Sequence, residues 1–163
     1  MSTLFRLLLV CLLLFTGPLL PLLPAAAQPK AAAPAVRILS AQAGLFGQPG
    51  DEAGPFRPGS QLPLRDGQTF GWMMALQTTQ KRVRVREEIT LPQEPRTWGD
   101  PEPDIKRKTS LDGRTATTEI WLEPRDGVIA HTWTVTQGDP KGTWVIKVWV
   151  DGQPERVFRF DAR

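Results

Sequence analysis

The sequence predicts an all-β domain, an immunoglobulin-like antiparallel β-sandwich of about seven strands. Between Thr143 and Val150 the apolar residues Trp144, Ile146 and Val148 occupy every second position, which is typical of a strand with one buried face. Asp151-Gly152 follows and predicts a tight turn into the next strand. No helical periodicity follows residue 27, so the strand pattern decides the fold class.

Seven segments show this alternation, and Gly, Pro and Asp turn signals separate them. Two long connections, 47–66 and 92–104, lack it. The first either is disordered or holds a short edge strand around Gln61–Leu64. The predicted strands are Val36–Phe46, Gln68–Gln77, Val83–Leu91, Thr115–Leu122, Val128–Val135, Thr143–Val150 and Pro154–Asp161.

The amino-terminal segment predicts export to the periplasm or the outside of the cell. Residues 1–27 combine Arg6, an apolar run and a small-residue ending, as a cleaved signal peptide does. Residues 28–35 are rich in Pro and Ala and predict a mobile tether, which leaves 36–163 as a single domain. No transmembrane segment is expected after processing.

Composition excludes several classes of function. Removing residues 1–27 removes the only cysteine and one of 20 basic residues, so 19 basic residues face 17 acidic ones. A net charge of about +2 does not favour nucleic acid as a partner. Without cysteine the processed chain has no thiolate nucleophile and no disulfide, and no cofactor is expected.

Catalytic and metal-binding motifs are also missing. The single histidine, His131, lies in phase with Ile129 and Trp133 and is interpreted as a core-edge residue that bonds a neighbouring loop. One histidine is too few for a zinc site. The acidic stretch 100–104 lacks the ligand pattern of a calcium loop, and basic residues follow it directly. The sequence therefore predicts no metal site and no enzyme.

A row of cations follows one strand. Lys81, Arg82, Arg84 and Arg86 share one side, either as a solvated sheet face or as a docking strip for an anionic partner. The same alternation turns Glu87 inward. A carboxylate is costly to bury, so a β-bulge near this residue is the preferred interpretation, and pairing with an inward cation is the alternative.

Six tryptophans are many for a domain of this size. Three share the phase of apolar neighbours and should belong to the core: Trp72, Trp133 and Trp144. Trp121 and Trp149 are out of phase with the aliphatic residues beside them, and Trp98 lies in a long loop. These three either form an interface or a sugar-stacking platform, or are covered by the long loops.

Several short stretches resemble one family of bacterial exported domains of unknown function. They are Gly44-Leu45-Phe46, Phe70-Gly71, Leu91-Pro92 and the run from Gly138 to Gln153. The resemblance covers Val36 to Arg163. It implies an envelope β-sandwich with no assigned catalysis, and it carries no functional residues over to this chain.

The leading functional hypothesis is a non-catalytic exported domain that binds an envelope protein through a sheet face. The expected contact residues are Trp98, Trp121, Trp149, Arg82, Arg84 and Arg86. The alternative is a carbohydrate-binding module that stacks a glycan on the exposed tryptophans. An enzyme that uses Glu87 and His131 is set aside, because no feature of the sequence indicates that these two side chains meet.

Overall fold

The computed structural model describes residues 35–47, 56–101, 103 and 105–163. The predicted signal peptide and all but the last residue of the predicted tether lie outside these residues. The described part is built from β-strands, and none of its segments forms a helix of the length and apolar character that a membrane span needs.

Ten strands form within the described residues, in two sheets. Seven of them confirm the predicted strands, with ends that differ by at most a few residues. The strands are β1 (Val36–Phe46), β2 (Phe56–Pro58), β3 (Gln61–Leu62), β4 (Thr69–Thr78), β5 (Val83–Thr90), β6 (Lys106–Thr109), β7 (Thr115–Leu122), β8 (Val128–Thr134), β9 (Gly142–Val150) and β10 (Arg156–Ala162).

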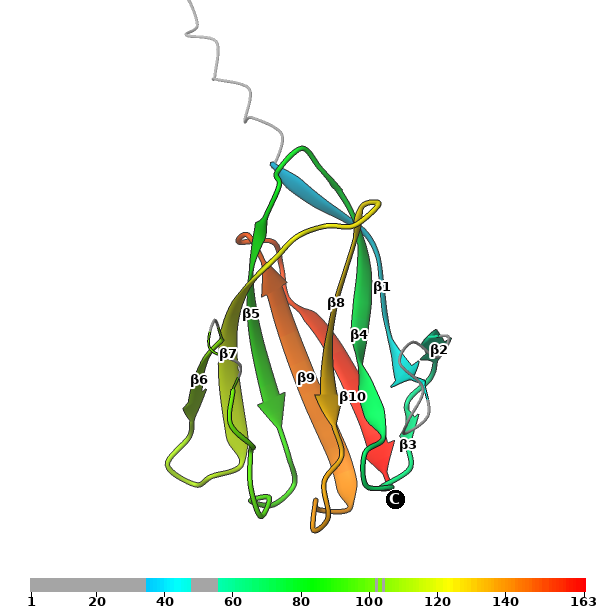
Figure 1. Cartoon of the computed structure of the whole chain (residues 1–163), viewed down its shortest axis with the longest axis vertical. Coiled ribbons are helices and arrows are strands. Elements are labelled where there is room, and N and C mark those ends of the chain that lie inside the picture. The colour runs from blue at the N-terminus through cyan, green and yellow to red at the C-terminus, as the bar shows by residue number, and fades with distance from the viewer. Residues whose placement is uncertain (1–34, 48–55, 102, 104) are drawn as a thin grey trace, which may run out of the picture. The chain divides into compact units, whose positions relative to one another are not determined.

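The two sheets differ in width. Sheet A has four strands in the order β2-β1-β4-β8, and sheet B has six in the order β3-β10-β9-β5-β7-β6. All named pairs are antiparallel except β3 with β10. Figure 1 shows that β7 and β6 extend sideways beyond β8, the last strand of sheet A. The sandwich is therefore open on this side.

The core lies between the inner faces of the two sheets. Phe70 of β4 meets Trp144 of β9 and Phe160 of β10 edge-on, each with ring centroids 5.3 Å apart. All three rings are buried, and burying an apolar side chain of this kind contributes about 2 kcal/mol. These aromatic contacts fix the two sheets against each other.

A glycine permits the close pairing of β4 with β8. Gly71 faces Thr132 in the register, and a Cβ at this position would lie 2.1 Å from the carbonyl oxygen of His131. No side chain tolerates that distance from backbone. The glycine therefore lets β8 approach closely and sets the position of the histidine.

Three short strands raise the count from about seven to ten. The sequence predicts β3 as a possible edge strand, but it does not predict β2 or β6. Each is an outermost strand and has at most four residues, too few for alternation to be recognised. An immunoglobulin-like sandwich remains the correct class.

Candidate functional site

The outer face of sheet B gathers five of the six predicted contact residues, and we call this set the Trp121 face. In the strand register Arg84 lies opposite Trp121, and Arg86 lies between Glu119 and Trp149. Arg82 precedes β5 in the same phase. The indole of Trp121 is 56% exposed, so no loop covers it within the described residues.

Carboxylates accompany each arginine of the Trp121 face. Arg84 donates to Glu119 at 2.9 Å, and Arg82 lies 3.7 Å from Glu123. Arg86 lies 3.8 Å from Glu88, which also approaches Lys147. The row is thus largely neutralised within its own sheet, as expected for a solvated sheet face.

Arginine also affects its neighbours through electrostatics and stacking. The hydrogen bond and the charge of Arg84 hold the pKa of the Glu119 carboxyl below its ordinary value. The guanidinium of Arg86 lies 5.0 Å from the centroid of the Trp149 ring, a cation–π contact. Trp149 is thereby half-buried, whereas Trp121 remains the most exposed indole of this face.

Hollows surround Trp121 on the open side of the sandwich. Strand β6 pairs with β7 only as far as Glu119, so the end of β7 forms a sheet edge. One hollow of about 560 Å³ reaches from Trp121 to His131, and one of about 640 Å³ reaches from Trp121 to Ala130. The indole therefore stands between concave surfaces that can receive a ligand's side chains.

Trp98 does not join the Trp121 face. Its indole Nε1 donates to the carbonyl of Gly113 at 2.8 Å, and its ring meets Trp133 edge-on at 5.9 Å. The side chain is partly buried and packs against the core. The structure therefore separates Trp98 from the other predicted contact residues and places it in a second region.

That second region contains a buried carboxylate. Glu87 is 0% exposed and shares the inner face of β5 with Val85 and Ile89. The predicted bulge is wrong, because the register of β5 with β7 and β9 runs through Glu87 without a shift. Strict alternation turns this side chain inward, and the opposite sheet supplies its partners.

Three nitrogen groups of sheet A approach the two oxygens of Glu87. The indole Nε1 of Trp72 donates to Oε2, and that of Trp133 donates to Oε1 at 2.5 Å. Nδ1 of His131 lies 3.1 Å from Oε2. We call Glu87, its three partners Trp72, Trp133 and His131, and the nearby Arg107 the Glu87 cluster. Charge-assisted hydrogen bonds of this kind offset the cost of burying a carboxylate.

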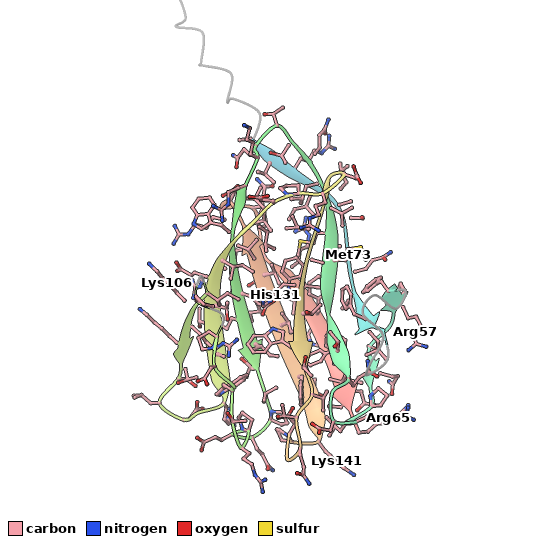
Figure 2. The ribbon with its side chains drawn as sticks, in the orientation of Figure 1. Arg57, Arg65, Met73, Lys106, His131 and Lys141 are labelled. Carbon is pink, nitrogen blue, oxygen red and sulfur yellow. The ribbon has the colours of Figure 1, made fainter. Side chains whose placement is uncertain are left out.

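The prediction for His131 is half correct. It lies on the inner side of β8 in phase with Ile129 and Trp133, but its partner is Glu87 on a strand and not a loop. A carboxylate oxygen only accepts, so Nδ1 carries the hydrogen when Glu87 is ionised. The imidazole is 13% exposed and lines the open side of the sandwich, near the middle of the view in Figure 2.

Arg107 adds the one cation of the cluster. Its Cζ lies 4.6 Å from the centroid of Trp133, whose indole N–H already donates to Glu87. Nη1 donates to the carbonyl oxygens of Trp98 at 2.6 Å and Gly99 at 3.2 Å. Burial lowers the pKa of the guanidinium, and attraction by Glu87 opposes part of that change.

Arg107, Thr118 and Glu87 form one row across the inner face of sheet B. Thr118 lies opposite Arg107 on β6 and opposite Glu87 on β5. Nε of Arg107 and Oγ1 of Thr118 are buried and have no hydrogen-bond partner among the described residues. Buried polar atoms without partners are rare, so two in one row mark an unusual place in the core.

A cleft of about 280 Å³ opens beside this row, and we call it the Trp98 cleft. Trp98 and Arg107 contribute to one wall, and residues from His131 to Thr134 on the free edge of β8 contribute to the other. Asp100 and Asp139 also line it. The cleft thus combines three indoles, a guanidinium, an imidazole, two carboxylates and threonine hydroxyls.

Sequence reasoning did not find Arg107 or the cleft. Arg107 lies in the basic stretch that directly follows the acidic segment 100–104. Its inward direction follows from alternation in β6, where Lys106 and Lys108 are exposed, but four residues give too weak a signal. Within the described residues no group of three metal-ligating side chains comes together.

Comparisons with known proteins agree with the fold. Residues 41–163 match the family described as PM0630 beta sandwich domain. An immunoglobulin-like protein (PA1606) from Pseudomonas aeruginosa is similar over 82% of this chain and 100% of its own, with 19% identity and a TM-score of 0.54. The PmoD soluble domain from Methylocystis sp. ATCC 49242 (Rockwell) has 14% identity over 78% of this chain and 90% of its own, with a TM-score of 0.35. No curated protein sequence matches.

Proposed function

The chain belongs to the PM0630 beta sandwich domain family, and from this premise we propose that it is a non-catalytic binding domain of the cell envelope or exterior. Its partner is a protein that docks on the Trp121 face. The signal-peptide pattern of residues 1–27 supports export. The observation that carries the proposal is the exposure of Trp121, at 56%, on the outer face of sheet B.

A tryptophan between hollows is well suited to anchor a partner. Interface energy concentrates in a few large side chains, and tryptophan is enriched among them. The two hollows beside Trp121 lie on the open side of the sandwich, where the partner's side chains have room. Val157 on β10 is also exposed and extends the apolar surface of sheet B.

The arginines of the Trp121 face have a smaller part in this proposal. Arg82, Arg84 and Arg86 each lie near a glutamate of the same face, so they present little uncompensated charge. Exposed pairs of this type contribute little because solvent screens them. We therefore expect Trp121, and not the cationic row, to dominate the affinity for the partner.

The test is capture of the partner from the native envelope fraction, followed by a direct binding measurement with the purified partner. Trp121→Ala should abolish both capture and direct binding. Leu111→Ala is the matched control, because Leu111 is an exposed apolar residue in the turn between β6 and β7. Equal capture and equal direct binding by the Trp121→Ala variant would contradict the proposal.

A glycan partner is the second candidate, favoured by the exposed indole beside a hollow that Arg82 and Glu123 line. Sugar rings stack on such indoles while polar side chains bond their hydroxyls. Titration with a panel of cell-wall and plant glycans, followed by tryptophan fluorescence, separates the two candidates. A saturable change that Trp121→Ala abolishes would favour the glycan.

A further inference from the structure

The Trp98 cleft has the composition of a small-ligand site. It lies next to the hollow between Trp121 and His131 and shares Ile105, His131 and Thr132 with it. Ligand pockets combine aromatic walls with a few converging polar groups. Here Trp98 and Trp133 supply the aromatic walls, and Arg107 and His131 supply nitrogen groups. At about 280 Å³ the cleft suits a compact molecule, such as one ring with one polar substituent.

His131 is held in a definite orientation by the carboxylate beneath it. With Nδ1 directed at Glu87, the other ring nitrogen, Nε2, has no hydrogen-bond partner among the described residues. A ring fixed in this way presents one nitrogen for a ligand, as imidazoles with a carboxylate behind them do elsewhere. The Glu87 cluster thus orients His131, which is one of the two side chains that offer a polar contact to a ligand in the cleft.

Arg107 supplies the second contact. Its Nη1 donates to two backbone carbonyls, and its Cζ lies over the Trp133 ring. Holding the guanidinium in place lowers the entropy cost of binding an anion. The buried Nε lacks an acceptor within the described residues, so the protein leaves part of this guanidinium without a hydrogen-bond partner.

We propose that the Trp98 cleft binds a small organic acid, with Arg107 as its counter-ion and the indoles of Trp98 and Trp133 against its apolar body. His131 lines the cleft beside them. A carboxylate suits the site because planar guanidinium groups favour planar oxyanions.

The experiment uses benzoate as the probe and the neutral benzamide as its isostere. Titration of the purified chain with benzoate should give saturable NMR shifts at Trp98, Arg107 and Thr132, with a dissociation constant in the millimolar range or below. Benzamide and Arg107→Gln should each weaken binding by roughly tenfold or more, the effect of losing one charge-assisted hydrogen bond.

Two further measurements keep the test independent of folding defects. Arg107→Lys preserves the charge but not the planar donors, so it should retain weak binding. Arg159→Gln on β10 lies outside the residues that line the cleft and should leave the affinity unchanged. Equal affinity for benzoate and benzamide, absence of saturable shifts in the unmodified chain, or tighter binding of glucose in the cleft would each overturn the proposal.

Discussion

The two faces of β5 carry adjacent glutamates in opposite environments. Glu87 points inward, is fully buried and accepts hydrogen bonds from groups on β4 and β8. Glu88 points outward and lies 3.8 Å from Arg86 and 3.7 Å from Lys147. The inner carboxylate depends on its partners because water cannot replace them, whereas the outer one keeps its access to solvent.

The difference extends to the arginines on either side. Arg107 on the inner face is partly desolvated, which lowers its pKa. Arg84 on the outer face stays in solvent and instead lowers the pKa of its neighbour Glu119. Charges on the inner face of sheet B thus contribute to the core, whereas charges on its outer face mainly keep that face soluble.

The sharpest test of this contrast is the same substitution at both glutamates. In Glu87→Gln one acceptor oxygen becomes an NH₂ donor, so either Trp72 or Trp133 faces a donor whichever way the amide is turned. We expect a loss of about 3 kcal/mol in the free energy of unfolding, measured by urea denaturation. Glu88→Gln should change it by no more than about 0.5 kcal/mol. Equal losses would contradict the contrast.

A smaller loss of unfolding free energy is expected when a tryptophan of the Glu87 cluster is replaced by phenylalanine. Trp133→Phe keeps an aromatic ring but removes the N–H that donates to Oε1 of Glu87, and it leaves a smaller ring beneath Arg107. The expected loss is about 2 kcal/mol, again from urea denaturation. Trp121→Phe on the outer face is the control and should stay within about 0.5 kcal/mol. A larger loss of unfolding free energy in Trp121→Phe than in Trp133→Phe would contradict the contrast.

The smallest effect concerns a single titration on the outer face. Arg84→Gln should raise the pKa of Glu119, because the guanidinium lowers it through a hydrogen bond and through charge. Since the folded-state pKa is lowered, the pair's contribution to stability is present above the ordinary glutamate value and is lost as the pH falls through the lowered one. NMR titration of the side-chain carboxyl measures the shift. Arg82→Gln should leave Glu119 unchanged, because its own partner is Glu123.

Alternation predicts the seven longer strands and both faces of β5. It also directs Glu87 inward, but the cost of burying a carboxylate made a bulge the preferred interpretation. The information that reverses this choice lies on β4 and β8, whose indoles meet Glu87 only after the two sheets have packed. Sequence spacing along one strand does not encode which residues of the opposite sheet lie above it.

The candidate sites show the same limit. Phase alone predicts that Trp121 and Trp149 face outward, and the structure places them so. Trp98 and Arg107 lie in or beside a long connection, where no period indicates direction. Their meeting with Trp133 joins segments that are far apart in the sequence. Sequence reasoning therefore finds the sheet face and misses the cleft.

The tryptophans that hold Glu87 also give the domain an internal optical reporter. Their hydrogen bonds to that carboxylate join positions 15 and 46 residues apart along the chain, one from each of two strands in the opposite layer. Such distant contacts form late and slowly in β-rich topologies. Tryptophan fluorescence should change when Trp72 and Trp133 form their hydrogen bonds to Glu87. It would therefore report the packing of the two sheets during refolding without an added dye.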